Sequence, residues 1–249
     1  MKNALLVTAI LFIVLSVRSQ TVFIRSGKIE FERKTNFHRL YFTGETDSWV
    51  DEFKKLIPQF RTDYFDLVFT DNKTFYKPGK DPEFVQNSGF LESPAMENVV
   101  YKDLEQQISV SQKKVFESQF LLADSNKVLK WKLEPETRTI AGFECKKAIT
   151  RICDSVVVVA FYTDQIITPG GPESFNGLPG MILGLAVPRL YTTWFATKLE
   201  NISAADETKI AAPAKGKKAT STDMIAKVAD VIKNWGEKYR DRSIWFITL

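Results

Sequence analysis

The segment that decides the fold is GPESFNGLPGMILGLAVPR, residues 171–189, an apolar run interrupted by glycine and proline. Proline presets the φ angle of the second position of a type II turn, and glycine supplies the positive φ of the third position. The residues predicted to form this structural turn are Gly177, Leu178, Pro179 and Gly180. A buried strand is predicted next, over residues 181–187. The alternative is a phosphate-binding loop, but the segment has no GxGxxG or GK[ST] pattern and no helix is predicted after it.

Short apolar segments separated by turn residues extend from this point toward both ends of the chain. Their apolar residues mostly alternate with polar ones, which is typical of strands that are buried on one face. The segments predicted as strands are residues 28–42, 99–101, 106–112, 115–122, 128–133, 139–151, 156–163 and 190–199, and residues 64–78 are predicted as a hairpin with its turn at Asp71 and Asn72. Their short connections predict antiparallel pairing. Strands and helices do not alternate as in a nucleotide-binding α/β fold.

Two segments have the spacing of amphipathic helices. In DSWVDEFKKLI, residues 47–57, Trp49 and Phe53 lie four residues apart and Pro58 follows, so a short helix is predicted to cover the sheet. Residues 223–242 predict a second helix with its own apolar stripe. That stripe consists of Met224, Val228, Val231, Ile232 and Trp235. The apolar tail at 243–249 is expected to dock on the body or to add an edge strand.

The predicted fold class is mainly β with flanking α: a curved antiparallel sheet or half-barrel, with a short helix in the N-terminal half and a C-terminal helix. We divide the chain into a signal peptide at 1–19, a β-rich domain at 20–200, a flexible linker or loop at 201–222, and the amphipathic helix and tail at 223–249.

The N-terminus predicts export. Lys2 is followed by an uncharged apolar run over residues 4–17 and then by small residues, so a signal peptide cleaved between Ser19 and Gln20 is expected. Periplasm or cell envelope is the predicted location. Cleavage removes Lys2 and Arg18, which lowers the net charge of +4 to +2. This balance gives no sign of a nucleic-acid-binding surface. Peripheral membrane association and the oligomeric state are left open.

The segment FNGLPGMILGL resembles the signature of the GLPGLI family, which comprises exported proteins typical of Bacteroidetes. The resemblance continues upstream in WKLEPETRTIAGFECKKA and DSVVVVAFYTDQI and spans roughly residues 27–200, although Met181 stands where the family name has leucine. It implies a β-rich envelope protein of unassigned biochemical function, and it supplies no catalytic residues to transfer to this chain.

The inventory of catalytic residue types is small. His38, the single histidine, lies in a predicted strand, so a histidine-based zinc cluster within one chain is excluded. Paired carboxylates such as Asp51 and Glu52 occur in charged surroundings that solvated surfaces also produce. We assign no catalytic, metal-binding or cofactor-binding residue and no cofactor, and we leave open whether the chain is an enzyme.

Cys145 and Cys153 form a disulfide or remain thiols. An exported chain with two cysteines favours a disulfide. The turn predicted at Asp154 and Ser155, however, places Cys153 at a hairpin tip and Cys145 well down the preceding strand. We predict free thiols.

The function expected from the sequence is that of an exported, non-enzymatic envelope protein that binds an apolar ligand or an outer-membrane partner. An apolar cavity on the concave face of the sheet would hold the ligand. One alternative is a hydrolase or redox enzyme that uses His38 or the cysteines. The other is a structural component of an outer-membrane transport assembly.

Overall fold

The computed structural model describes residues 23–82 and 95–249. The predicted signal peptide and its cleavage site lie outside the described residues. The elements are β1 (Gly27–Asn36), α2 (Phe37–Phe42), α3 (Ser48–Leu56), β2 (Phe60–Phe69), β3 (Lys73–Pro78), β4 (Val99–Asp103), β5 (Ile108–Val115), β6 (Ser118–Ser125), β7 (Lys132–Ile140), β8 (Phe143–Ile152), β9 (Val156–Thr163), β10 (Met181–Val187), η1 (Pro188–Leu190), β11 (Thr192–Glu200), α4 (Ala204–Glu207), β12 (Lys217–Ala219), α5 (Ser221–Val231) and α6 (Glu237–Thr248).

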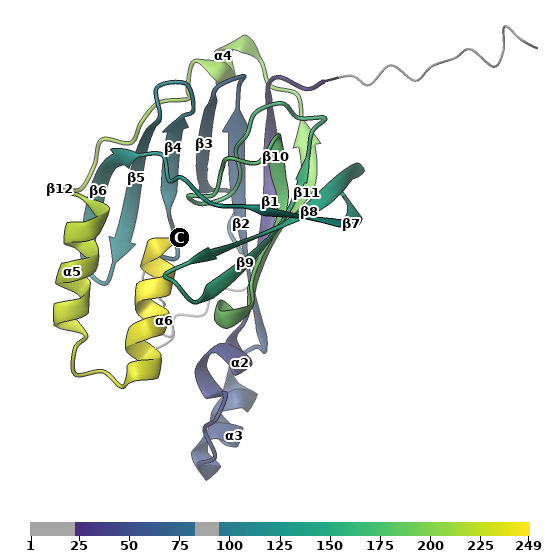
Figure 1. The fold of residues 1–249 in the computed structure, drawn as a ribbon. Helices are drawn as coiled ribbons and strands as arrows, with labels where there is room; N and C mark the ends of the chain where they lie inside the picture. Colours follow the sequence, from purple (N-terminus) through teal and green to yellow (C-terminus); the bar gives the residue numbers. More distant parts are fainter. Residues whose placement is uncertain (1–22, 83–94) are drawn as a thin grey trace, which may run out of the picture.

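One open, curved sheet contains twelve strands in the order β12-β6-β5-β4-β3-β2-β1-β11-β10-β9-β8-β7. Neighbouring strands run antiparallel, except that β12 pairs in parallel with β6. Strands β7–β9 cross in front of β10 and β11, and α5 and α6 lie beside each other at the other side of the molecule (Figure 1). The predicted fold class, a curved antiparallel sheet with flanking helices, is confirmed.

Residue alternation decides which face of the central strands is buried. Along β1, Ile29, Phe31 and Arg33 point to the interior, whereas Lys28 and Glu30 lie on the outward face. This period of two is the direct consequence of the pleat of a strand. Strand β10 is buried along almost its whole length, as predicted from its continuous apolar sequence.

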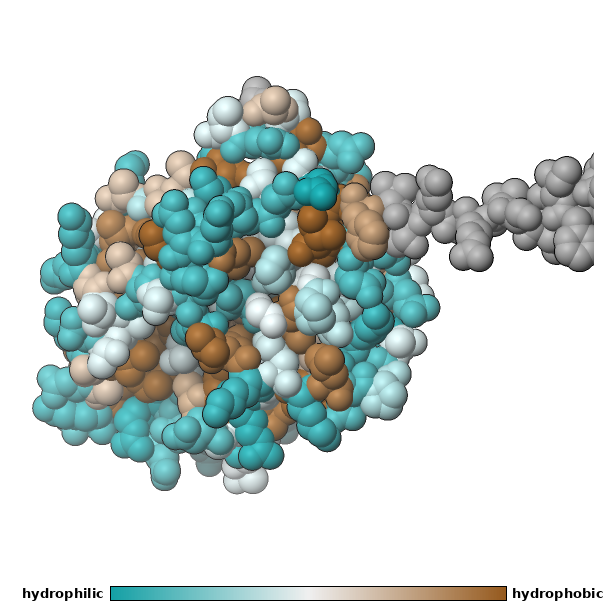
Figure 2. All heavy atoms as spheres, turned by 45° about the horizontal axis from the view of Figure 1, so that its top comes forward, coloured by the Kyte–Doolittle hydropathy of each residue, from teal (hydrophilic) through white to brown (hydrophobic). Residues whose placement is uncertain are grey.

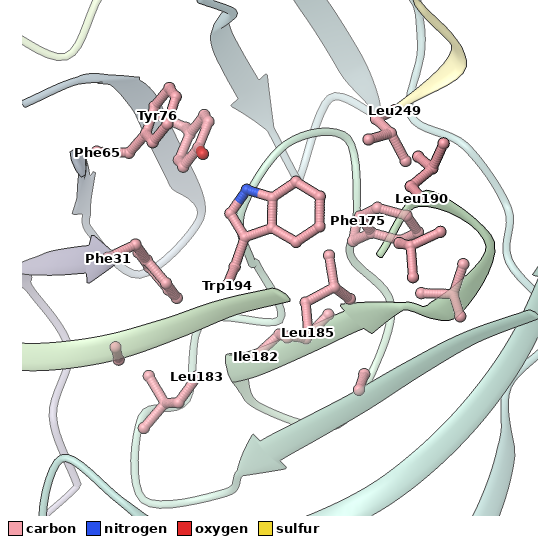
Figure 3. Packing of buried hydrophobic residues seen from close by; sticks show 14 of the residues in the cluster. Phe31, Phe65, Tyr76, Phe175, Ile182, Leu183, Leu185, Leu190, Trp194 and Leu249 are labelled. Carbon is pink, nitrogen blue, oxygen red and sulfur yellow. The ribbon is translucent and has the colours of Figure 1, made fainter. Parts of the chain in front are cut away.

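The main core is centred on the fully buried Trp194 of β11 (Figure 3). On one side of its indole lie Phe65 and Tyr76, whose rings stack with centroids 4.8 Å apart. On the other side lie Phe175 and Leu249, from the loop before β10 and from the end of α6. Side chains from both halves of the sheet and from the C-terminal helix therefore meet in one core.

A second, smaller core lies between β5, β6 and the helix pair α5–α6. Met224, Val228 and Ile232 of the predicted stripe are buried there, but Val231 is 66% exposed and Trp235 is 46% exposed. The single predicted helix is in fact two helices. The apolar tail docks as predicted, as the last turns of α6 and not as a strand.

Helix α3 begins and ends where predicted, between Asp47 and Ile57. Of its predicted apolar stripe, Trp49 is 54% exposed and Leu56 is 75% exposed, whereas Val50, outside that stripe, is buried in the main core. Trp49 and Phe53 instead make edge contacts with Phe42 of α2. The two helices project together from one end of the sheet (Figure 1).

The chain bends at the predicted turn, with positive φ angles of +86° at Gly177 and +135° at Gly180. Gly180 N donates to the Leu178 carbonyl at 2.7 Å, and Met181 N donates to the Ile166 carbonyl at 3.1 Å. The hydrogen bond that closes a type II turn would join Met181 to Leu178, so this bend differs from the predicted one. A Cβ atom at Gly180 would lie 2.0 Å from the Thr163 carbonyl oxygen, which explains why glycine is required.

Residues 201–222 include α4 and β12 and lead from β11, in the interior of the sheet, to the edge formed by β12. Ser203 caps α4 in a capping box with Asp206. On the side of the molecule that carries α4, hydrophilic residues cover most of the surface and hydrophobic ones form small separate groups (Figure 2). Within the described part of the chain, helices are too short or too polar to cross a bilayer.

Candidate functional site

Several charged side chains are buried inside the curved sheet. Arg33 of β1 forms an ion pair with Asp63 of β2 at 2.9 Å, and its other terminal nitrogen lies 3.7 Å from Glu173. Burial raises the pKa of Asp63, but the neighbouring Arg33 and Arg61 lower it by more than burial raises it, so the pKa of Asp63 lies below its ordinary value. Because these charges pair with one another inside the protein, we assign the group a structural role.

The buried Lys102 and Lys113 and the half-buried Lys127 join the sheet and the loop after β6 to the segments that fill the concave side. Lys102 donates to the Phe175 carbonyl at 2.8 Å, and Lys113 donates to the Ile247 carbonyl at 2.9 Å. Lys127 donates to Ser174 Oγ at 3.2 Å. Burial lowers the pKa of all three, that of Lys113 to about 7. Their acceptors belong to the protein, so we assign them a structural role.

A pocket of about 380 Å³ opens to solvent where α2, η1 and α6 meet. We call it the α2–α6 pocket. It is lined by Arg39, Leu40, Thr43, Arg189, Tyr191, Glu237, Lys238, Asp241, Arg242 and Trp245. Aromatic, cationic and acidic side chains therefore share one open cavity, and this is the candidate functional site.

Local structure explains how each element presents its side chains. In α2, the Asn36 side chain caps the helix by accepting from Arg39 N at 3.0 Å. In α6, Lys238, Asp241 and Trp245 lie three and four residues apart, so they share one helix face. Tyr191 has a left-handed backbone with φ 48°, which turns the chain from η1 into β11.

Arginine and tryptophan contacts shape the pocket wall. The Arg189 guanidinium lies over the Trp245 ring, 5.3 Å from its centroid. Arg242 lies 4.5 Å from the Tyr41 ring centroid and 4.8 Å from that of Tyr239, and it donates to the Leu40 carbonyl. Such contacts hold a planar guanidinium in a defined orientation. Burial lowers the pKa of Arg242 from its ordinary value, but arginine remains cationic.

A second pocket, of about 390 Å³, lies on the outward face of the sheet near α4. Its central Lys28 is 3.1 Å from Glu200, 3.8 Å from Asp66 and 3.5 Å from Glu30. Burial raises the pKa of Asp66, whereas Lys198 and Lys28 lower that of Glu200. The charges of this pocket pair with one another, so it is the weaker candidate for a ligand site.

The residues singled out from the sequence do not line either pocket. His38 lies in α2, not in the predicted strand, and its Nε2 is 3.1 Å from the Ile57 carbonyl oxygen. Cys145 is buried in β8, and Cys153 is exposed at the tip of the β8–β9 hairpin. The two cysteines are free thiols and do not form a disulfide. At the bend, Leu178 is buried in the main core and Gly180 is buried, whereas Gly177 and Pro179 are exposed. Among the described residues, groups of three or more His, Cys, Asp or Glu suited to a metal ion do not occur.

Sequence reasoning missed the pocket residues. Arg189 ends the segment that opened the sequence analysis, and Trp245 lies in the tail that was expected to dock. Both were treated only as parts of structural segments. Their approach to Arg39 depends on the packing of α2, η1 and α6, which local sequence patterns do not reveal.

Two solved structures of PNGF-II share the fold. One, in a P21 crystal form, aligns with a TM-score of 0.53 at 18% identity and covers 82% of this chain and 34% of that chain. The other, in a C2 form, aligns with a TM-score of 0.53 at 15% identity and covers 89% of this chain and 33% of that chain. The chain thus spans about a third of the length of these relatives. None of the curated proteins matches it.

The family model described as "N-glycanase peptide, N-terminal domain" matches residues 83–226, which is more than half of the chain. This match overturns the resemblance to the GLPGLI family. It also overturns the expected function of a non-enzymatic envelope protein that binds an apolar ligand or an outer-membrane partner, together with the two alternatives based on His38, the cysteines or a transport assembly. The chain belongs to the family of the N-glycanase N-terminal domain.

Proposed function

We propose that this chain recognises the carbohydrate of glycoproteins, as a binding domain of the N-glycanase type, through the α2–α6 pocket. The family name connects the domain with an enzyme of N-linked glycans. The chain spans about a third of the PNGF-II chains, so the proposal concerns recognition by this domain and does not assign it the activity of the longer proteins.

The observation that carries the proposal is the composition of the α2–α6 pocket. A sugar ring presents apolar C–H groups on its faces and hydroxyl groups around its edge. Trp245 and Tyr191 offer half-buried aromatic surface, and Arg39, Glu237 and Asp241 offer hydrogen-bond donors and acceptors at the rim. The volume of about 380 Å³ lies within the range of about 300–1,000 Å³ that is typical of small-ligand sites.

We also propose that the protein is exported. Support for the finer prediction, a signal peptide cleaved between Ser19 and Gln20, comes from the charge and the apolar run of the first nineteen residues. The N-terminal sequence of the protein purified from its native host tests this cleavage site directly.

Calorimetric titration with an N-glycopeptide, and with the same peptide lacking its glycan, tests the binding function. The wild-type chain should bind only the glycosylated peptide. Trp245→Ala should weaken binding at least tenfold, because it removes aromatic surface from the pocket wall.

Trp235→Ala is the matched control, since Trp235 is also a surface tryptophan near α6 but lies outside the pocket, against Phe116. This variant should bind like the wild type. Equal binding of both peptides, or unchanged binding by Trp245→Ala, would overturn the proposal. If the chain instead released free glycan, and Asp66→Asn and Glu200→Gln abolished this release, a hydrolytic function would lie at the second pocket, which surrounds Lys28.

A further inference from the structure

The α2–α6 pocket contains more positive charge than its own acids neutralise. In the part of the chain that the structure describes, the ion pairs do not include Arg39, Arg189 or Arg242. Lys238 is paired with Glu45 at 3.1 Å and donates to the Thr43 carbonyl at 2.6 Å. The pocket therefore contains three guanidinium groups without a carboxylate partner.

The acidic side chains at the rim do not change this balance. Asp241 lies 3.6 Å from Arg240, which is outside the pocket lining. Glu237 is exposed in the first turn of α6, where the helix dipole favours a negative charge. Glu237 is therefore stabilised by its own helix and leaves the three arginines available.

Arg242 gives the strongest indication that the pocket is suited to bind an anion. The residue is only 8% exposed, and a buried cation has a large desolvation penalty unless an anion or hydrogen-bond acceptors compensate it. The Leu40 carbonyl and two aromatic rings compensate it in part. An anionic group bound in the pocket would lower this penalty further.

The three arginines come from α2, η1 and α6, so their convergence depends on the folded chain. A planar guanidinium binds a carboxylate, sulfate or phosphate through two parallel hydrogen bonds, which a neutral hydroxyl cannot match. Trp245 contacts one face of the Arg189 guanidinium, and a contact to the face does not use the N–H groups at the edge of the guanidinium.

We infer that the α2–α6 pocket selects glycans with an anionic group, either a sugar carboxylate or a sulfate or phosphate ester, and that Arg39 and Arg189 determine this specificity. The inference rests on the proposed glycan-binding function and adds the substrate class. The aromatic wall contacts the sugar ring, and the arginines bind its anionic substituent.

Matched pairs of glycans test the specificity: one N-glycan with and without terminal sialic acid, and N-acetyllactosamine with and without a sulfate ester. The acidic member of at least one pair should bind ten times more tightly or better, since one charge-assisted hydrogen bond is worth about a factor of ten. Comparison of the two pairs shows whether a carboxylate or an ester is the preferred group. Affinity for the acidic member should also fall as salt concentration rises.

Variants locate the effect. Arg39→Gln and Arg189→Gln should each abolish most of the preference for the acidic glycan, because they should lower the affinity for the acidic glycan far more than the affinity for the neutral one. Arg151→Gln is the control, because Arg151 is an exposed arginine on β8 outside the pocket. Thermal unfolding of each variant shows that it is folded.

Equal affinity for acidic and neutral glycans, with binding still lost in Trp245→Ala, would overturn this inference and leave the glycan-binding function intact. Absence of binding to every glycan would overturn both. Competition by inorganic sulfate as effective as that of the sulfated sugar would overturn the inference by showing that the pocket does not contact the sugar.

Discussion

Lys113 of β5 donates a hydrogen bond of 2.9 Å to the carbonyl oxygen of Ile247 in α6, across 134 residues of sequence. Both residues are buried. The bond links the sheet to the last turn of the C-terminal helix, and among the residues described no carboxylate lies at ion-pair distance from the Lys113 side chain.

Stability should therefore depend on the ionisation of Lys113. Burial, with a contribution from Lys127, lowers the pKa of Lys113 from 10.5 to about 7. Between pH 7 and 10.5 the unfolded chain binds this proton and the folded chain does not, so stability rises with pH, by at most about 1.4 kcal/mol per pH unit. Below pH 7 both states are protonated and the full penalty remains.

Urea unfolding of the wild type and of Lys113→Met from pH 6 to 10 measures this effect. The wild-type unfolding free energy should rise relative to that of Lys113→Met above pH 7. Lys114→Met is the control, because Lys114 is the exposed neighbour on the same strand. A constant difference between wild type and Lys113→Met over this range would contradict the prediction.

Asp63→Asn should destabilise the protein by about 3–5 kcal/mol, because it removes the nearer of the two carboxylates that pair with the buried Arg33. The folded-state pKa of Asp63 is lowered, so its contribution is present above pH 4 and is lost as the pH falls through the folded-state pKa. Chemical denaturation at pH 7 and at low pH measures both effects.

The Arg25–Asp71 pair provides the comparison, since both of its side chains are exposed. Asp71→Asn should change the unfolding free energy by less than about 1 kcal/mol. A cost of the same size for both substitutions would show that burial of the Arg33–Asp63 pair has no special importance.

Gly180→Ala should destabilise the protein far more than Gly142→Ala. Both glycines have positive φ, +135° and +86°, so both substitutions introduce backbone strain on the order of 1–3 kcal/mol. A Cβ atom at Gly142 meets open space, whereas one at Gly180 lies 2.0 Å from the Thr163 carbonyl oxygen. Melting temperatures measure the difference, and similar values for both variants would contradict the steric explanation.

The two cysteines should react differently with an alkylating reagent. Cys153 is exposed, while Cys145 is buried and burial raises its pKa to about 11, so its thiol stays neutral and inaccessible. Intact mass should show one label on the native protein and two labels in denaturant, without a reductant. Labelling that requires a reductant would mean that the pair forms a disulfide.

The strands of the sheet could be predicted from the sequence because the alternation of apolar and polar residues that marks a strand lies within a short segment of the chain. Strand β1 alternates interior residues such as Ile29 and Phe31 with outward charges, and β10 is a continuous apolar run between a bend and Pro188. The N-terminus of α2 was missed, although Asn36 is a good capping residue, because the alternating pattern before it was extended through His38.

The candidate site could not be predicted in the same way. Arg39, Arg189 and Trp245 lie far apart in the sequence, and each has an ordinary local role in a helix or a turn. The buried lysines had a weak signal, since Lys113 occupies an inward position of β5 between Ser111 and Val115. Its acceptor lies on α6, and only tertiary packing brings the two together.

The sheet order separates the chain into two runs of consecutive strands, β1–β6 and β7–β11, which join where β1 pairs with β11. Lys28 of β1 pairs with Glu200 of β11, so β1 is synthesised more than 170 residues before the strand with which it pairs. Until then β1 presents an unpaired edge, and unpaired edges are templates for aggregation. Substitutions that weaken the pairing of β1 with β11 should therefore lower the yield of folded protein during synthesis. Molecules that have already folded should be affected less, as measured by their unfolding free energy.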